Sequence, residues 1–331
     1  MKTIKILSIM TLVSLSGFAQ PKKTGKWIQT DPRFSSLISP DAQVEILVEG
    51  FTWSEGPVWN KPGDFLLFSD VPENTIYRWK EGEGLSTFLS PSGYTGILPY
   101  SLEPGSNGLI FNKDGELVAC EHGDRRISKM PLQAGGKVTV ADNWDGKRFN
   151  SPNDIVQASH GRYYFTDPPY GLPDRENATT REIDLFGVYM VDLDGQVKLV
   201  VSDLSRPNGL AFSPDEKWLY VAQSDPERPV IMKYPVLENG LLGDGQLFFD
   251  AKPLAEKGLA GLPDGLKVDL KGNVFATGPG GLMIVSPEGD LLGRIETGML
   301  TANCNWGGDG SVLYITANHV VGRIQTQTKG F

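Results

Sequence analysis

The chain has 331 residues, of which 40% are hydrophobic, and this length and composition suit a soluble protein with one large domain or two ordinary ones. A formal net charge of −9 at pH 7 argues against the basic surface that nucleic-acid binding requires, so no nucleic-acid partner is expected. Two cysteines and three histidines are too few for a disulfide framework, and they argue against a zinc site built from thiolates and imidazoles.

The N-terminal segment has the features of a secretory signal peptide. Lys2 and Lys5 precede an apolar run over residues 6–13, and small residues follow at Gly17 and Ala19. A buried first helix or a membrane anchor is the alternative interpretation, but the run is too short to span a bilayer. We therefore expect residues 1–19 to be cleaved and the protein to be exported, either to the periplasm or out of the cell. No later segment of the sequence is long and apolar enough to predict a membrane span.

A repeated strand–turn–strand pattern occupies most of the remaining chain. Five units each start with a polar residue eight positions before the end of a turn, and they recur at intervals of roughly 50 residues. Their starting residues are Glu55, Asn107, Asn153, Asn208 and Asp264. A sixth unit, "ANCNWGGDGSVLYITA", has the same turn and second strand, with Ala302 at the aligned position and Asn303 beside it.

Repeats of this length with four strands each are typical of a β-propeller. Six units predict six blades, so we expect an all-β fold in which residues 44–331 form a six-bladed β-propeller and residues 20–43 an N-terminal extension. The last unit is short of a strand, and the segment "VEILVEG" (residues 44–50) is expected to complete it and close the ring. An array of β-sandwiches would not account for a polar residue at one fixed offset.

The fixed offset places polar side chains at the centre of the predicted propeller. A residue just ahead of the innermost strand of a blade lies at the mouth of the central channel, so the five starting residues should converge. Carboxylate and amide oxygens without sulfur or imidazole suit a hard cation such as calcium. Glu55 and Asp264 together would balance one divalent ion, and without it they would repel each other. The alternative is that these residues are turn formers that bond to their own backbone.

Several motifs resemble those of the gluconolactonase/SMP-30 (regucalcin) family, and most of all its microbial gluconolactonases. They include "SNGLIFNKDGELVACEHGDRRISK", "KRFNSPNDIV", "YFTDPPYGL", "RPNGLAFSPDEKWLYVA" and "LPDGLKVD". The resemblance implies a divalent cation in the central channel, usually Ca²⁺, with Zn²⁺, Mn²⁺ or Mg²⁺ as alternatives. The family's ligands, a Glu, two Asn and an Asp, fall on Glu55, Asn153, Asn208 and Asp264. Asn107 matches the microbial branch, where it is expected to line the substrate pocket.

The activity that the resemblance implies is hydrolysis of a sugar lactone to the aldonic acid, a small-molecule reaction. Asp264 is the candidate general base that activates water. The alternatives are a phosphotriesterase or aryl-ester hydrolase that uses the same ion, and a non-catalytic, metal-stabilised propeller that binds a sugar or a protein. The sequence leaves the oligomeric state open.

Three further side chains near the repeat are candidates for substrate binding. His122 could contact substrate or transfer protons, or be a hydrogen-bonded structural histidine. Asp167 could orient a ligand, or belong to the turn before two prolines, and Tyr170 could form a wall of the pocket. A disulfide between Cys120 and Cys304 is considered if both residues reach the channel mouth.

Overall fold

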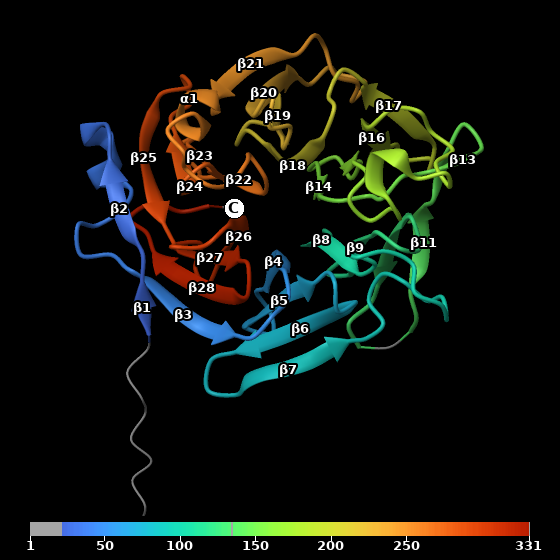
Figure 1. Ribbon diagram of the computed structural model, residues 1–331, viewed down its shortest axis with the longest axis horizontal. Coiled ribbons are helices and arrows are strands. Elements are labelled where there is room, and N and C mark those ends of the chain that lie inside the picture. The colour runs from blue at the N-terminus through green and yellow to red at the C-terminus, as the bar shows by residue number, and fades with distance from the viewer. Residues whose placement is uncertain (1–21, 134, 331) are drawn as a thin grey trace, which may run out of the picture.

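The structure is a computed structural model that describes residues 22–133 and 135–330, so the predicted signal peptide lies outside the described residues. Within these ranges, six antiparallel sheets are arranged like blades around one axis (Figure 1). Four sheets have four strands and two have five, and a separate pair, β12 (Asn143–Trp144) and β13 (Lys147–Arg148), follows the second blade. The predicted six-bladed β-propeller is confirmed.

Five blades follow the repeat in chain order, each with its first strand innermost. The first blade consists of β4 (Ser54–Asn60), β5 (Phe65–Asp70), β6 (Thr75–Lys80) and β7 (Gly84–Leu89). The second consists of β8 (Ser106–Phe111), β9 (Leu117–Glu121), β10 (Arg126–Met130) and β11 (Val138–Ala141). The third consists of β14 (Ile155–Gln157), β15 (Tyr163–Asp167), β16 (Gly187–Val191) and β17 (Val197–Val201). The fourth consists of β18 (Pro207–Phe212), β19 (Trp218–Gln223), β20 (Val230–Pro235) and β21 (Gln246–Asp250). The fifth contains β22 (Leu266–Val268), β23 (Val274–Gly278), β24 (Gly281–Val285) and β25 (Leu291–Glu296).

The sixth blade joins the two ends of the described chain. Its strands β26 (Thr301–Gly307), β27 (Val312–Ala317) and β28 (Val320–Gln325) come from the C-terminal end, and β3 (Val44–Glu49) pairs with β28. This pairing confirms the closing strand predicted from the sequence. The sixth blade is therefore built from strands that come from both ends of the described chain.

The segment before β3 adds outer strands to two blades. β1 (Lys23–Thr24) pairs with β3, and β2 (Lys26–Gln29) pairs with β25 of the fifth blade. The 3-10 helix η1 (Pro32–Ser36) inserts the buried Phe34 into the core between blades five and six. The segment expected to be an extension is therefore packed on the propeller wherever the structure describes it. Two more short helices, η2 (Arg175–Asn177) and α1 (Lys252–Ala255), lie in loops.

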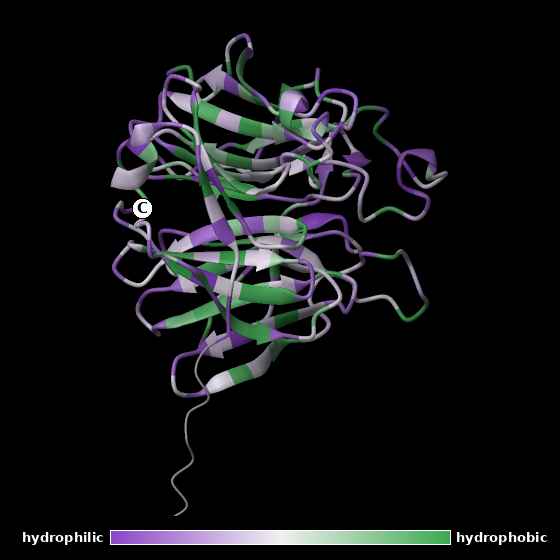
Figure 2. Ribbon diagram, turned by 60° about the vertical axis from the view of Figure 1, so that its left-hand side comes forward, coloured by the Kyte–Doolittle hydropathy of each residue, from purple (hydrophilic) through white to green (hydrophobic). Residues whose placement is uncertain are grey.

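Apolar side chains fill the space between neighbouring blades. Tyr164 and Val188 of the third blade pack with Leu210 and Leu219 of the fourth, and all four are fully buried. Figure 2 shows hydrophobic positions recurring along the strands of the blades. Because each blade packs on two neighbours, the hydrophobic core surrounds the axis.

Cys120 in β9 and Cys304 in β26 are both buried free thiols, so the disulfide considered from the sequence is not formed. Each packs as a small apolar side chain in an inter-blade core. In the described ranges, no helix combines the length and apolarity needed to cross a membrane.

Candidate active site in the central cavity

Five polar residues predicted from the repeat converge at the centre of the propeller. They lie in or just before the innermost strands of the first five blades, and they line one cavity of about 490 Å³. These residues are Glu55, Asn107, Asn153, Asn208 and Asp264. The first four are buried and Asp264 is partly exposed. Residues that are far apart in sequence are thus brought together in the way that the fixed offset predicted.

β-Bulges change the direction of side chains at the start of several innermost strands, where the polar residues of the cavity lie. The pairing of β4 with β5 shifts between Glu55 and Val58, and equivalent shifts occur in blades two and four. In the sixth blade the shift lies between Thr301 and Asn303. A bulge turns a side chain away from the regular alternation of a strand, so these shifts direct polar side chains toward the axis.

Glycines that follow the polar residues allow neighbouring blades to approach closely at the centre. A Cβ added to these glycines would meet the backbone of the next polar residue, at distances far below the usual carbon–oxygen contact. It would lie 2.1 Å from the Asn107 oxygen at Gly56, 2.7 Å from the Asn153 oxygen at Gly108 and 2.2 Å from the Asp264 oxygen at Gly209. The Glu-Gly and Asn-Gly pairs of the repeat therefore serve close packing at the axis, a role that a turn signal alone did not indicate.

The two carboxylates of the ring carry strongly perturbed pKa values. Burial raises the pKa of Glu55 to about 7, opposed by hydrogen bonds from the Gly56 amide (2.9 Å) and the Asn303 side chain (3.1 Å). Burial also raises the pKa of Asp264 well above its usual range, and the negative charge of Glu55 adds to the shift. Two carboxyl groups whose charged forms are disfavoured by burial, and in Asp264 also by the Glu55 charge, form a site that a cation would stabilise.

Amide groups complete the ring. The Nδ2 of Asn208 donates to the Ser224 hydroxyl at 2.9 Å, and that hydroxyl donates to the Pro263 carbonyl at 2.6 Å. Because the donor of the Asn208 amide is engaged, its oxygen is the atom that can face a cation. In the sixth blade, Asn303 uses its amide to donate to Glu55, so it orients a ring carboxylate.

This donor set fits a hard divalent cation only if amide oxygens are counted. Within the described residues, no group of three or more His, Cys, Asp or Glu side chains forms a candidate metal cluster. The ring instead combines two carboxylates with amide oxygens, the ligand types that calcium accepts. Asp154 adds a further carboxylate nearby, and this one is buried. Burial raises its pKa, and its Oδ2 has no hydrogen-bond partner in the described part of the chain.

The three predicted substrate residues differ in position. Tyr170 lines the cavity, as expected for a pocket wall. Asp167 does not line it, because its carboxylate is buried and accepts hydrogen bonds from the Asn150 and Ser151 amides at 2.8 Å. His122 is also absent from the lining, and its fully buried ring contacts the Glu103 carbonyl at 3.0 Å. The structure therefore favours structural roles for Asp167 and His122.

Sequence reasoning missed three charged residues that line the same cavity. Glu103, Arg175 and Arg206 come from loops or strand ends outside the polar offset. Arg175 pairs with Glu103 at 3.3 Å, and Arg206 pairs with Glu176 at 2.6 Å. The repeat could not indicate these three residues, because each lies in a different loop and at no position that the repeated units share. Trp53, Leu262 and Leu300 add apolar walls.

Comparisons with known proteins agree with this architecture. Residues 53–319 match the family described as SMP-30/Gluconolactonase/LRE-like region. A gluconolactonase of Zymomonas mobilis is 40% identical over 339 residues, which cover 99% of this chain and 95% of that protein. A solved gluconolactonase of Xanthomonas campestris superposes with a TM-score of 0.81 at 29% identity, covering 95% of this chain and 99% of the other. A regucalcin structure from Agrobacterium tumefaciens, described as calcium-binding, has a TM-score of 0.67 at 18% identity and covers 86% and 94%. This last likeness concerns the fold alone.

Proposed function

The chain belongs to the SMP-30/Gluconolactonase/LRE-like family, and from this premise we propose that it hydrolyses sugar lactones in the central cavity with the help of a bound calcium ion. Lactone hydrolysis is supported by the 40% identical gluconolactonase, which aligns over nearly the full length of both chains. The single observation that carries the site assignment is the convergence of Glu55, Asn153, Asn208 and Asp264 in one cavity.

The candidate ligands suit a divalent cation in charge and in chemistry. Glu55 and Asp264 supply two carboxylates to the cavity, and a divalent ion would stabilise the charged forms that burial and neighbouring negative charges disfavour. Asn153 and Asn208 supply neutral oxygens. All four are hard ligands, which favours Ca²⁺ over softer metals. When bound, such a cation polarises the lactone carbonyl and makes water more acidic.

The chain's own residues supply the proton transfers. Asp264 accepts a proton from the water that adds to the carbonyl carbon of the lactone. The bond between that carbon and the ring oxygen then breaks, and the proton passes to the ring oxygen to form a hydroxyl group. The reaction gives a single product, an open-chain carboxylic acid, because the hydroxyl group that leaves the carbonyl carbon stays attached to the same molecule. Tyr170, Trp53 and Leu262 wall the cavity and limit access of further water.

We also propose that the protein is exported, on the basis of the charged and apolar pattern of residues 1–19. Intact-mass measurement of the protein from a host that processes signal peptides tests this. We expect the mass of a mature chain that begins near residue 20, and the mass of the uncleaved chain would contradict export.

The activity is tested by acid release from glucono-1,5-lactone, followed with a pH indicator and corrected for spontaneous opening. Paraoxon and phenyl acetate serve as a phosphotriester and an aryl ester. We expect turnover of the lactone to exceed that of both. A preference for either ester would support the rival hydrolase, and no turnover of any of the three would support a non-catalytic propeller.

A further inference from the structure

Glu103 is a cavity residue that the proposed reaction does not use. It lies in the loop between β7 and β8, and its side chain is 22% exposed. It lines the cavity together with Glu55 and Asp264, and its negative charge contributes to the raised pKa of both. The carboxylate is therefore close to the predicted reaction centre while lying outside the ring.

One oxygen of the Glu103 carboxylate is free to bind a ligand. Its Oε1 accepts from Arg175 Nη2 at 3.3 Å, and its Oε2 has no hydrogen-bond partner among the residues the structure describes. Arg175 offsets the negative charge, so the free oxygen does not need a cation as its partner. A neutral hydrogen-bond donor, such as a hydroxyl group, suits this position.

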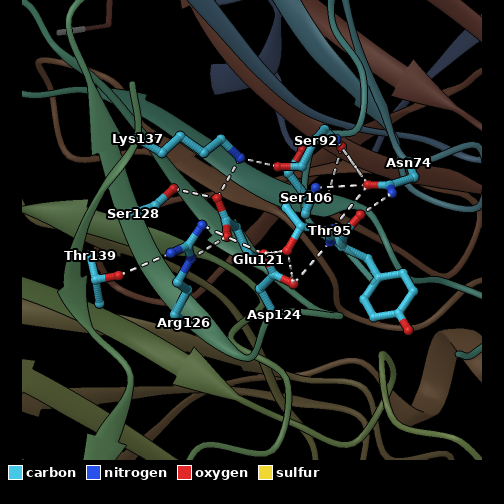
Figure 3. A network of polar contacts seen from close by, with 12 residues as sticks. Asn74, Ser92, Thr95, Ser106, Glu121, Asp124, Arg126, Ser128, Lys137 and Thr139 are labelled. Atoms are coloured by element: carbon cyan, nitrogen blue, oxygen red, sulfur yellow. Dashed lines mark hydrogen bonds and ion pairs between the residues drawn. The ribbon is translucent and has the colours of Figure 1, made fainter. Parts of the chain in front are cut away.

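The loop that carries Glu103 is anchored at its first end by a dense polar network (Figure 3). The Oδ1 of Asn74 accepts from the Ser92 and Gly93 amides at 2.9 and 2.7 Å. Asp124 accepts from the Thr95 amide at 3.0 Å. Lys137 links the Ser92 carbonyl to the buried Glu121 carboxylate. These contacts fix the direction in which the loop leaves β7 at the outer edge of the first blade, and Asp124 and Lys137 tie it to the second blade.

His122 anchors the other end of the loop, at Glu103 itself. Its Nδ1 lies 3.0 Å from the Glu103 carbonyl, and its backbone amide donates to the Gly105 carbonyl at 3.1 Å. Burial lowers the pKa of His122 to about 4, so at neutral pH the ring is uncharged. A carbonyl can only accept, so Nδ1 carries the proton. Gly171 packs against the ring, where an added Cβ would lie 2.3 Å from the His122 Cβ.

From these contacts we infer that Glu103 determines specificity by accepting a hydrogen bond from a hydroxyl group on the lactone, with His122 as the residue that positions it. The cavity would then select lactones with hydroxyl substituents over unsubstituted ring esters. The inference rests on the proposed lactone hydrolysis and adds a substrate feature to it. The physical basis is that a charged acceptor already held in position binds a matching hydroxyl donor more tightly than a mobile acceptor does, because less conformational entropy is lost on binding.

The test compares glucono-1,5-lactone with δ-valerolactone, which has the same ring without hydroxyl groups. A hydrogen bond to a charged group contributes about 1.5–3 kcal/mol, or roughly 10- to 150-fold. Glu103→Ala should lower the ratio of kcat/KM on the hydroxylated lactone to kcat/KM on δ-valerolactone by about this factor, because any effect of its charge on Asp264 is common to both lactones. Glu103→Gln, which keeps an acceptor oxygen, should recover part of the loss. His122→Phe, like Glu103→Ala, should reduce the preference for glucono-1,5-lactone over δ-valerolactone.

Glu176→Ala is the matched control, because Glu176 also pairs with an arginine at the cavity but does not line it. It should leave the preference between the two lactones unchanged. Equal losses on both lactones in Glu103→Ala, or no loss on either, would overturn the inference while the activity stands. A wild-type protein that opens neither lactone would refute the proposed function and the inference with it. Urea denaturation of each variant confirms that it is folded.

Discussion

Replacing Gly209 by alanine should damage the site without touching any polar side chain. Gly209 follows Asn208 in β18, and its φ is not positive, so an alanine can adopt its backbone conformation. The added Cβ would, however, lie 2.2 Å from the backbone oxygen of Asp264 and 2.7 Å from the Gly265 Cα. Backbone atoms cannot rotate away, so the fourth and fifth blades must separate at the axis.

The size of the effect follows from this overlap. Relief requires a shift of about 1 Å at Asp264, since carbon and oxygen atoms in contact are normally more than about 3 Å apart. Overpacking of this kind costs about 1–3 kcal/mol of unfolding free energy. A displacement of about 1 Å at a reacting group can lower turnover by about 10²-fold. We therefore expect a modest loss of stability together with a large loss of kcat/KM.

The assay combines urea denaturation with lactone turnover at saturating calcium. Gly136→Ala is the control, because Gly136 also lacks a positive φ and its added Cβ would meet nothing within 4 Å. That variant should match the wild type in both measurements. If Gly209→Ala were as active and as stable as the control, close packing of the glycines would not be what positions the ring.

The remaining predictions concern charge, protonation and ring closure. Asp264→Asn should lose about 10²–10⁴-fold in turnover, because an amide cannot accept the proton from water, whereas Asn107→Ala should be milder. In EDTA, Asp264→Asn should be at least as stable as the wild type, because repulsion with Glu55 is removed; a marked loss in circular-dichroism melting would contradict this. Burial lowers the pKa of His122 from 6.5 to about 4, so the unfolded chain binds a proton that the folded chain does not, and stability falls as pH drops through this window. Wild type should therefore lose about 2 kcal/mol more than His122→Asn between pH 7 and pH 5 in urea denaturation, and equal losses would refute this origin. Deleting residues 1–49 removes β3, exposes the edge of β28 and should cause aggregation in size-exclusion chromatography; a monodisperse, stable product would contradict ring closure by this strand.

The sequence predicted those features that recur with the repeat. The blade number, the closing strand and the convergence of Glu55, Asn107 and Asp264 all follow from one offset that is shared by several units. Such features are visible because every blade has the same geometry at its innermost strand. For Asn303 the sequence showed only its place beside the aligned Ala302; its hydrogen bond to Glu55 was not predicted, and the bulge in β26 explains why its side chain reaches the ring.

Features that occur once were not predictable in this way. Glu103 and Arg175 come from loops of different lengths, and nothing in their neighbouring residues indicates that they reach the cavity. His122 follows β9 and Asp167 ends β15, the second strands of their blades, where substrate contact and structural hydrogen bonding are equally compatible with the sequence. Their hydrogen-bond partners, which only the folded chain brings together, favour the structural roles.

Lactone hydrolysis is proposed to need one divalent cation, held by Glu55, Asn153, Asn208 and Asp264. The most direct measurement is metal content per chain, determined together with turnover of glucono-1,5-lactone before EDTA treatment, after it, and after calcium is restored. We expect about one calcium ion per chain, turnover that falls to the spontaneous rate in EDTA, and recovery with calcium. Full turnover by a protein from which metal analysis shows that all divalent ions have been removed would contradict this requirement.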